Sequence, residues 1–297
     1  MKKILLIDSM AFIFRAFYGF NGANLTNAKG ESTVAIYGFC LFLDDLIKLV
    51  APTHIAVAFE SPVETFRKKA YPQYKATRKE TPHEIIDAIP VIQNILKARR
   101  IPILQQEGYE ADDVIGTVAN MAKKKGFEVF MATPDKDYAQ LVSEQVYMCR
   151  PKHGGGYEIL NTQDVCQKYG LNNTQQVIDL LALMGDKSDN IPGCTGIGEK
   201  TAVKLLQQFG SIDGIYAHRE EVKGGLESRV LEQEEQVRFS YFLAKICTDA
   251  PIDFQESAFA VQPADTAALL AIYKELNFNS FIHQLYTSST PQQLELF

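Results

Sequence analysis

The chain has 297 residues, a formal net charge of −6, 46% hydrophobic residues and 22% charged residues. This length and composition are ordinary for a folded globular protein, and they exclude a disulfide-stapled miniprotein, a fibrous repeat and a largely disordered chain. The net acidity argues against nucleic-acid binding over the whole surface, since phosphate contacts need Lys and Arg.

The beginning of the chain superficially resembles a secretory signal, but Asp8 and Arg15 interrupt the apolar run and no small-residue cleavage site follows. No stretch of the sequence reaches the roughly 20 apolar residues that a membrane-spanning helix needs. Five widely spaced cysteines without a Cys-x-x-Cys pair suggest neither a zinc site nor a disulfide framework. We therefore expect a cytoplasmic protein.

The first 150 residues alternate short β-branched runs with longer helical patterns, as βαβ units around a parallel sheet do. Gly126 is expected to follow the third helix as its C′ residue. The predicted fold class is therefore α/β, with a mostly parallel central sheet flanked by helices. Strands are predicted at residues 4–7, 55–59, 101–105 and 129–133, and helices at residues 33–50, 85–99 and 111–125.

The sequence pattern changes after about residue 165, where helices dominate. The last predicted strand lies at residues 157–160, and later helices are predicted at residues 177–184, 201–209 and 267–276. We expect three parts, which are an α/β domain of residues 1–165 with an exposed basic insertion at about residues 61–90, a helical domain of residues 166–286, and a flexible tail of residues 287–297.

Acidic residues gather at one edge of the predicted sheet. The carboxyl ends of parallel strands line a single crevice, so carboxylates that follow these strands should converge there. The acids that follow predicted strands are Asp8, Glu60, Asp135 and Asp137. Three more open the helix that follows a further strand, and two lie in a polar segment; these are Glu110, Asp112, Asp113, Asp186 and Asp189.

Each of these acids has an ordinary structural explanation as a helix cap or a turn residue. Held close together, however, they would repel one another and become protonated unless a cation neutralised them. Oxygen ligands without His or Cys select Mg²⁺ or Mn²⁺ over zinc. Two such ions about 3.5–4 Å apart are the usual device for displacement at phosphorus, so the pattern predicts a metal-dependent phosphodiesterase.

Residues 66–79 contain six cations, two Tyr and one Phe but no acid. A solvated helix face would explain an arbitrary run of Lys. Here the run closely follows Glu60, and aromatic rings interleaved with cations suit single-stranded nucleic acid through stacking and phosphate attraction. We therefore expect the insertion to bind a single strand beside the metal site.

Residues 193–201 nearly match the phosphate-binding loop G-x-x-x-x-G-K-[ST]. Glu199 stands where that loop has Lys, and a helix is predicted before the glycines where the loop requires a strand. A nucleotide-hydrolysing switch is therefore the weaker interpretation. The favoured one is a helix-hairpin-helix in which backbone N–H groups, Lys200 and Lys204 hold a duplex phosphate.

Together the motifs resemble the 5′-nuclease family, specifically the 5′→3′ exonuclease domain of bacterial DNA polymerase I, with flap endonucleases as more distant relatives. The resemblance covers nearly the whole chain. It depends on Leu-Ile-Asp8, Phe-Arg15-Ala, Phe66-Arg67, Tyr74-Lys75-x-x-Arg78, Glu110-Ala-Asp-Asp113-Val-Ile-Gly, Asp135-Lys-Asp137-x-Ala-Gln-Leu-Val and Leu-Met-Gly-Asp186-x-Ser-Asp189-Asn-Ile-Pro-Gly-x-x-Gly-Ile-Gly-x-Lys-Thr-Ala.

The resemblance implies a two-metal nuclease that acts on 5′ ends of nicks, gaps and flaps in DNA and on RNA primers, in replication and repair. It implies a monomer near the bacterial nucleoid, with the insertion forming a helical arch over the threaded strand. By position, Asp8, Glu60, Glu110 and Asp112 would serve the first metal and Asp135, Asp137 and Asp189 the second, while Asp113 and Asp186 would contribute directly or through water.

The resemblance also assigns contacts with the nucleic acid. Arg67, Lys75 and Arg78 would act in catalysis by holding the scissile phosphate or the threaded strand. Residues assigned to DNA binding are Arg15, Tyr74, Gly193, Gly196, Gly198, Lys200, Thr201 and Lys204, with K⁺ on the carbonyls of the glycine turn.

The sequence departs from the family at two positions, since the family usually has Asp in place of Glu60 and an acid in place of Lys69. The longer Glu60 side chain could displace the first metal. An alternative function is therefore a module that binds DNA junctions with weakened catalysis.

The chain ends in a polar stretch followed by large apolar residues, which polar tails usually lack. Its Gln-Leu-x-Leu-Phe run resembles the short peptide by which bacterial replication and repair proteins dock on the sliding clamp. We therefore expect clamp binding through Gln293, Leu294, Leu296 and Phe297.

Overall fold

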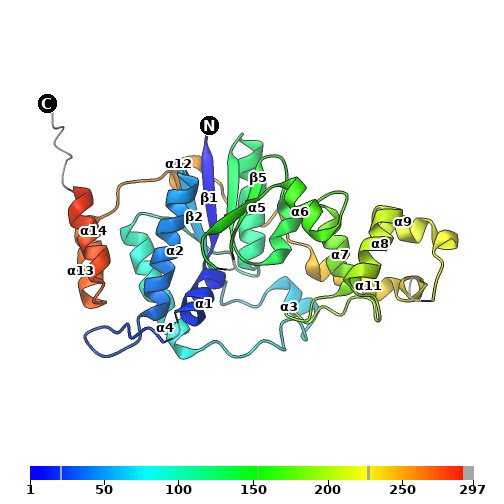
Figure 1. Cartoon of the computed structure of the whole chain (residues 1–297), viewed down its shortest axis with the longest axis horizontal. Coiled ribbons are helices and arrows are strands. Elements are labelled where there is room, and N and C mark those ends of the chain that lie inside the picture. Colours follow the sequence, from blue (N-terminus) through cyan, green and yellow to red (C-terminus); the bar gives the residue numbers. More distant parts are fainter. Residues whose placement is uncertain (21, 153, 226–227, 290–297) are drawn as a thin grey trace. The chain divides into compact units, whose positions relative to one another are not determined.

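The computed structural model describes residues 1–20, 22–152, 154–225 and 228–289, which Figure 1 traces from blue to red. Contacts between Cα atoms divide the chain into two compact units. Unit 1 comprises Met1–Asp8, Ala58–Glu80 and Leu104–Phe254, and unit 2 comprises Ser9–Val57, Thr81–Ile103 and Gln255–Phe297.

Six strands form one sheet in the order β3-β2-β1-β4-β5-β6. In unit 1, β1 pairs in parallel with β4, β4 pairs in parallel with β5, and β5 pairs antiparallel with β6. The sheet is thus mixed but mostly parallel, which confirms the predicted α/β class. The strands are β1 (Lys3–Asp8), β2 (His54–Ala58), β3 (Ile103–Leu104), β4 (Glu128–Ala132), β5 (Val146–Pro151) and β6 (Tyr157–Leu160).

The register between β1 and β4 brings the ends of these two strands together. Ile7, the last paired residue of β1, lies opposite Ala132, the last residue of β4. Both strands consist almost entirely of buried apolar residues, as strands covered on both faces do. The polar residues that follow each strand are consequently presented at the same edge of the sheet.

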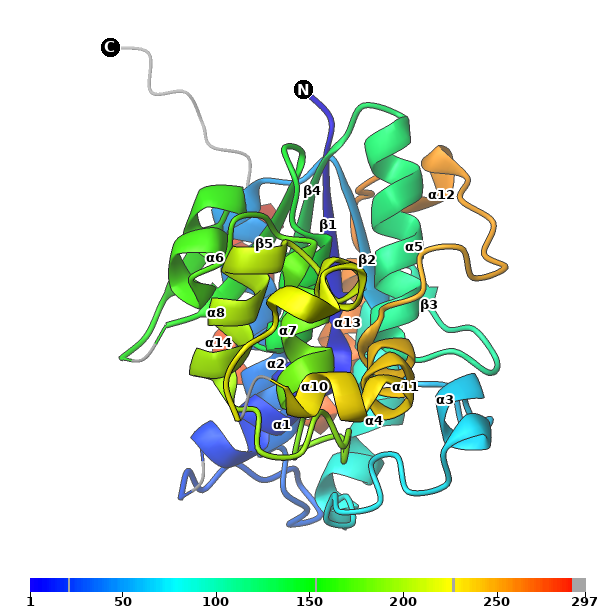
Figure 2. The ribbon, with the colours of Figure 1, turned by 90° about the vertical axis from the view of Figure 1, so that its right-hand side faces the viewer.

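Helix α5 (Ala111–Lys124) packs against β1 and β4 (Figure 2). Its first turn is stabilised by Asp113, whose carboxylate accepts a hydrogen bond from the backbone N–H of Glu110 at 3.1 Å. Gly126 follows its last turn with φ +78°, a conformation that glycine adopts without steric cost. The helix therefore begins and ends where its sequence signals predict.

The part of unit 1 that follows β6 is mostly helical, and two short helices, α3 and η1, precede it in the chain. Helix α7 packs against α8 and α11. The bounds are α3 (Phe66–Ala70), η1 (Lys136–Leu141), α6 (Thr162–Tyr169), α7 (Gln176–Met184), α8 (Glu199–Phe209), α9 (Ile212–Ala217), η2 (Arg219–Glu221), α10 (Arg229–Glu232) and α11 (Glu234–Ala244).

Unit 2 is built around packed helices. Its core includes the rings of Tyr37, Tyr273, Phe278 and Phe281, whose centroids lie 5.1–6.0 Å apart in their close pairs. The bounds are α1 (Ser9–Gly19), α2 (Val34–Val50), α4 (His83–Ala98), α12 (Glu256–Phe259), α13 (Thr266–Glu275) and α14 (Asn279–Ser289).

The basic insertion differs from the helical arch that the resemblance implies. Within residues 61–82 only the five residues of α3 are helical and turns follow as far as residue 78, while the last part of the insertion forms the start of α4 (His83–Ala98). Pro72 stands shortly after α3, where it cannot donate a backbone hydrogen bond, and Lys75 has φ +56°. The segment is therefore held by its contacts with the rest of unit 1 more than by its own hydrogen bonds.

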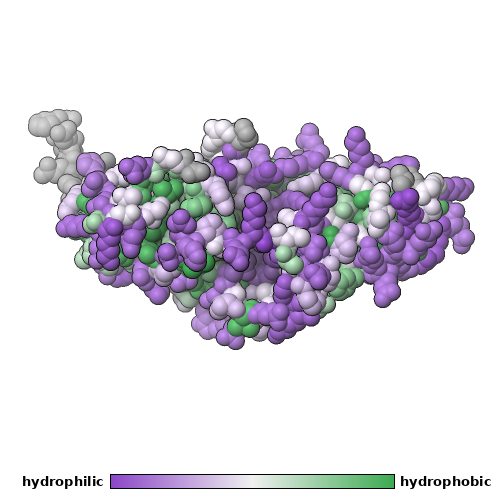
Figure 3. All heavy atoms as spheres, turned by 90° about the horizontal axis from the view of Figure 1, so that it is seen from below, coloured by the Kyte–Doolittle hydropathy of each residue, from purple (hydrophilic) through white to green (hydrophobic). Residues whose placement is uncertain are grey.

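The surface agrees with the ordinary composition of the chain. The face in Figure 3 is mostly hydrophilic, with hydrophobic residues gathered in smaller groups. Within the described ranges, no helix is long and apolar enough to cross a membrane.

Candidate metal and nucleic-acid site

One group of carboxylates lies where β1 and β4 end. Asp8, the last residue of β1, accepts hydrogen bonds from the hydroxyls of Thr133 at 3.0 Å and Tyr138 at 3.4 Å. The Thr133 hydroxyl also accepts from the backbone N–H of Asp135 at 3.1 Å, and the Asp135 carboxylate accepts from the N–H of Asp137 at 3.0 Å. These contacts connect three predicted metal ligands along the edge of the sheet.

A second group opens α5. One carboxylate oxygen from each of Glu110, Asp112 and Asp113 lies within 4.8 Å of the others. Asp113 is fully buried, and its two oxygens accept four hydrogen bonds, from two guanidinium nitrogens of Arg67 and from the backbone N–H groups of Glu110 and Cys247. Its lone pairs are therefore used within the protein, while Glu110 and Asp112 have capacity left for a metal.

Arg67 is 1% exposed and holds this second group in place. Its guanidinium donates to Glu110 at 2.9 Å, to both oxygens of Asp113 at 2.7 Å, and to the backbone carbonyls of Leu243 and Lys245 at 2.9 and 2.7 Å. Five hydrogen bonds account for all five N–H groups of an arginine. In this conformation no donor of Arg67 remains for a phosphate.

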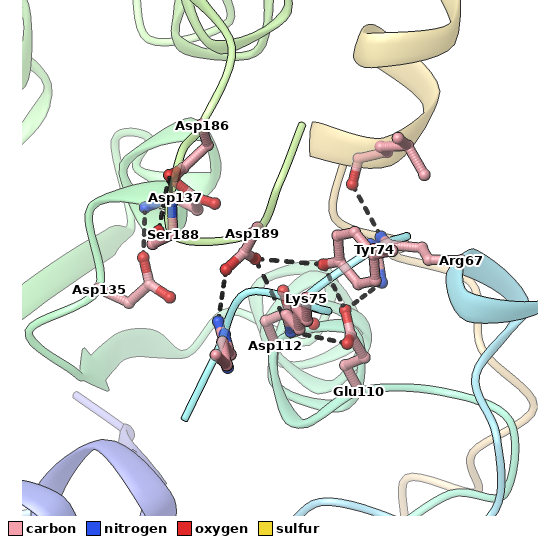
Figure 4. Close-up of polar contacts among 12 residues, drawn as sticks. Arg67, Tyr74, Lys75, Glu110, Asp112, Asp135, Asp137, Asp186, Ser188 and Asp189 are labelled. Carbon is pink, nitrogen blue, oxygen red and sulfur yellow. Dashed lines mark hydrogen bonds and ion pairs between the residues drawn. The ribbon is translucent and has the colours of Figure 1, made fainter. Parts of the chain in front are cut away.

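The turns after α3 bring further donors to the carboxylates (Figure 4). The Lys75 ammonium contacts Glu110 at 2.7 Å and Asp189 at 3.8 Å, and the Arg78 guanidinium contacts Asp189 at 2.5 Å. The buried Tyr74 hydroxyl lies 2.9 Å from Glu110 and 3.3 Å from Asp189. Tyr74 and Lys75 thus each contact a predicted ligand of both metals, and Arg78 contacts a predicted ligand of the second.

Asp186 and Asp189 belong to the segment between α7 and α8. Asp186 accepts from the N–H and hydroxyl of Ser188 at 2.7 and 2.6 Å and pairs with Lys136 at 3.0 Å. Burial raises the pKa of Asp186, but the Ser188 hydrogen bonds and the Lys136 charge outweigh it and hold the pKa below its ordinary value. Asp186 is therefore ionised and already paired.

Asp135 and Asp137 are placed differently. Desolvation raises the pKa of both carboxyls, and the neighbouring acids Asp135, Asp186 and Asp189 raise that of Asp137 further. The Asp137 Oδ1 atom is buried, and the described part of the chain provides it with no hydrogen-bond partner. A buried carboxylate without a partner is costly, and a hard divalent cation would remove that cost.

Glu60, two residues beyond the end of β2, accepts from the backbone N–H of Ala111 at 3.3 Å. Desolvation, with the charges of Glu110 and Asp8, raises its pKa to about 7. Lys75 and the Ala111 hydrogen bond act in the opposite direction. The donor set of the whole site consists of carboxylate oxygens, which fits Mg²⁺ or Mn²⁺.

The predicted hairpin joins α7 to α8. Gly193 and Gly196 have φ +64° and +86°, and a Cβ at Gly193 would collide with the backbone of Gly185. Helix α11 holds the turn, because the Ser240 hydroxyl accepts from the Gly193 N–H at 3.0 Å and Gln236 donates to its carbonyl at 2.6 Å. The turn therefore requires glycine and is anchored from outside.

The remaining predicted DNA contacts lie on helices. Lys200 and Lys204 are exposed and Thr201 is partly buried on the first turns of α8, which begins after Gly198. Arg15 is exposed on α1 of unit 2, with its guanidinium 5.6 Å from the centre of the Phe42 ring. The predicted clamp-binding residues Gln293, Leu294, Leu296 and Phe297 lie outside the described residues.

Sequence reasoning missed several groups that build the site. Thr133 and Tyr138 orient Asp8, and Lys136 neutralises Asp186. Lys136 lies between two predicted metal ligands in the sequence, and this position could have indicated that it belongs to the site. The carbonyls of Leu243 and Lys245, which hold Arg67, carry no signal, because a backbone acceptor is present at every position.

The fold and this carboxylate site define a class, the metal-dependent nucleases. Two family models match the chain, which are the N-terminal resolvase-like domain of 5′-3′ exonucleases over residues 3–170 and their C-terminal SAM fold over residues 172–267. The chain belongs to the 5′-3′ exonuclease family, which confirms the resemblance seen in the motifs.

Similar proteins include DNA polymerase I of Bacillus caldotenax, 41% identical over 99% of this chain and 34% of the relative. The 5′-3′ exonuclease of Aquifex aeolicus is 37% identical over 96% of each chain. The chain thus spans about a third of the length of the polymerase relative and nearly the whole of the exonuclease.

Among solved structures, T5 5′-exonuclease with divalent zinc ions bound matches with a TM-score of 0.70 at 18% identity, over 96% of this chain and 99% of that one. The catalytic core of Rad2 in complex with a DNA substrate matches with a TM-score of 0.62 at 16% identity, over 96% and 93%. At these identities the likeness establishes the shared fold.

Proposed function

We propose that the chain hydrolyses phosphodiester bonds at 5′ ends of nicks, gaps and flaps in DNA, and on RNA primers, in replication and repair. The observation that carries this proposal is the grouping, within unit 1, of carboxylates at the ends of β1 and β4, at the start of α5 and in the segment after α7, where cations of the basic insertion pair with Glu110, Asp113 and Asp189. The domain division predicted from the sequence, with a nuclease domain followed by a helical duplex-binding domain, is part of the same proposal.

Two Mg²⁺ or Mn²⁺ ions would be held by the carboxylates. Asp8, Glu60, Glu110 and Asp112 would serve one ion, and Asp135, Asp137 and Asp189 the other, with Asp113 and Asp186 behind them. When bound, the ions supply an activated water and stabilise the leaving oxygen. The buried Asp137 oxygen without a partner supports this assignment.

The protein's own cations would position the scissile phosphate. Arg78 is suited to this role, because its side chain is 50% exposed and its partner Asp189 is a proposed metal ligand. Lys75 is 21% exposed, and its ammonium would leave Glu110 and bind the phosphate instead. Arg67 would act from behind, by fixing the orientations of Glu110 and Asp113.

The test is cleavage of a 5′-labelled flap and of a nicked duplex with Mg²⁺, with Mn²⁺ and with EDTA. We expect cleavage with either metal and none with EDTA, and loss of cleavage in Asp112→Ala. Binding of both substrates without cleavage under any metal condition would favour the alternative, a junction-binding module weakened by Glu60. In that case Glu60→Asp should restore cleavage.

We further propose that the glycine turn and the start of α8 hold the downstream duplex, with K⁺ on the turn's carbonyls. Lys200→Ala should weaken duplex binding and lower the slope of log affinity against log salt by roughly one, as expected for one lost phosphate contact. An unchanged slope would remove Lys200 from the interface. Replacing K⁺ with a larger organic cation at equal ionic strength should also weaken duplex binding.

The sequence supports a bacterial sliding clamp as a further partner, through residues 293–297. A tethered nuclease would have a raised local concentration at nicks left by a polymerase. A labelled peptide of residues 287–297 should bind purified clamp, and a copy with Leu296 and Phe297 changed to Ala should not. The proposal also includes a monomeric protein associated with the bacterial nucleoid, which sedimentation and imaging of a tagged chain would test.

A further inference from the structure

The hydroxyl of Tyr74 lies between two carboxylates of unit 1, which the Lys75 ammonium also contacts. The residue is 3% exposed, and its oxygen lies 2.9 Å from Glu110 Oε2 and 3.3 Å from Asp189 Oδ2. A phenol has one proton to donate, so the two carboxylates share it. In the proposed function, Glu110 serves one metal and Asp189 serves the other.

The two carboxylates come from different parts of the fold. Glu110 precedes α5, while Asp189 lies in the segment between α7 and α8, 79 positions further along the chain. Both are buried, so negative charge on both would cause repulsion across a medium of low dielectric constant, which the neighbouring Lys75 ammonium offsets only in part. A shared donor between them offsets this repulsion and fixes their separation.

The backbone around Tyr74 keeps the phenol in this place. The N–H of the next residue, Lys75, donates to the carbonyl of Asp189 at 2.9 Å, and Lys75 has the left-handed φ of +56°. A side chain so enclosed has little surface to offer a base. The family resemblance instead implies a contact between Tyr74 and DNA.

We propose that Tyr74 is a positioning residue that joins the two metal sites, and that its hydroxyl sets the geometry in which Glu110 and Asp189 receive their ions. This inference rests on the proposed function, because it assumes that these carboxylates bind metal. Groups that orient metal ligands typically contribute about 10–100-fold to metal affinity.

The variant Tyr74→Phe removes the hydroxyl and keeps the ring. Mn²⁺ binding to the full chain without DNA, followed by electron paramagnetic resonance of the free ion, should show two sites in the wild type. In the variant, one of the two should bind about ten-fold more weakly. The midpoint of denaturant unfolding in EDTA, measured on the same samples, reports whether the fold is kept.

Tyr71→Phe is the matched control. Tyr71 lies three residues earlier and packs edge-on against Phe239 with ring centres 5.5 Å apart, and its hydroxyl makes no hydrogen bond to any residue whose position is described. Its isotherm should equal that of the wild type. The cleavage rate of Tyr74→Phe should recover at saturating Mn²⁺, with an unchanged KM for the flap, since the metal and not the DNA has lost a contact.

The possible outcomes are distinct. An isotherm of Tyr74→Phe that equals the wild type, or a raised KM for DNA that Mn²⁺ does not correct, would overturn the positioning role. A wild type that binds no Mn²⁺ at all would instead overturn the proposed function.

Discussion

The carboxylates of unit 1 fall into two groups that are neutralised in different ways. Glu110, Asp113 and Asp189 each form an ion pair with Arg67, Lys75 or Arg78 of the basic insertion. Asp135 and Asp137 form no ion pair with any described residue, and burial raises the pKa of both.

This difference shows which carboxylates would gain most from a bound metal ion. In the first group, protein cations already balance the charge, so a metal would have to compete with them. In the second group, a cation from solution would relieve like-charge repulsion and desolvation together. The cations of the basic insertion therefore neutralise the first group of carboxylates but not the second.

The largest expected effect is a loss of cleavage when the charge of one carboxylate in the second group is removed. Asp135→Asn keeps an oxygen that can accept from the Asp137 N–H but removes the charge. Cleavage of a 5′ flap in Mg²⁺ should fall about 1,000-fold or more, the upper range for loss of one electrostatic stabiliser. Unfolding in EDTA should occur at the same or a higher denaturant concentration, because repulsion is reduced. A lower midpoint would mean that Asp135 is balanced after all.

A carboxylate of the first group, which cations of the protein already neutralise, should instead lose folding stability when its charge is removed. Asp113→Asn leaves the Arg67 charge buried with a weaker partner, and breaking a buried pair costs about 3–5 kcal/mol. The free energy of unfolding, measured by denaturant titration, should fall by about this amount. The adjacent Asp112→Asn is the control, and it should leave stability unchanged or raise it, since Asp112 has a strongly raised pKa. Equal losses in both variants would end the distinction between the groups.

A third prediction tests whether burial alone, without a neighbouring cation, raises the pKa of a carboxyl outside the site. Asp179 on α7 accepts from the Ile212 N–H at 3.2 Å, and desolvation raises its pKa to about 6 from 3.8. The folded state holds this proton more tightly than the unfolded state, so stability should fall as pH rises from about 4 to 6 and then level off.

In Asp179→Asn the hydrogen bond can remain and the charge is absent. The variant should exceed the wild type by up to about 3 kcal/mol at pH 7.5, from the shift of about two pKa units, and match it near pH 4. Denaturant titrations at both pH values measure this. A constant difference between wild type and variant at both pH values would contradict the assignment to Asp179.

Much of this site was predictable from sequence because its residues follow strands or open a helix. Asp8 and Glu110 lie at positions that the apolar runs and the helix start define. The burial of Arg67 was not predictable, since an Arg within a basic run suggests exposure and its carbonyl partner Leu243 lies 176 positions away. Such long-range pairing depends on the packed fold and leaves no local pattern.

Some elements of the structure were not among those predicted from the sequence. Helix α1 contains four aromatic residues, and its buried residues Ser9, Phe12, Ile13 and Ala16 recur at helical spacing, so its sequence carries a helical pattern that the prediction left out. Strand β5 has six residues, but it contains Arg150 and ends at Pro151, which weakens a strand signal. Its place in the sheet comes from pairing with β4, which no local pattern reports.

The smallest effect tests competition between the insertion and the metal directly. Lys75→Gln removes the cation that lies 2.7 Å from Glu110, while the backbone N–H of residue 75 can still donate to Asp189. The nearby acids outweigh desolvation and raise the pKa of Lys75, so the wild-type side chain is charged at any pH of interest. Without it, Mn²⁺ should bind the chain about ten-fold more tightly, a modest share of the attraction between charges near 4 Å.

Cleavage by Lys75→Gln should nevertheless fall, because the phosphate loses its proposed cation. Lys79→Gln is the matched control, since this exposed side chain forms no ion pair in the part of unit 1 that is described. It should change neither Mn²⁺ affinity nor cleavage. If Lys75→Gln bound Mn²⁺ more weakly than the wild type, the lysine would be an orienting group like Tyr74 and not a competitor, and the contrast between the two carboxylate groups would lose its electrostatic basis.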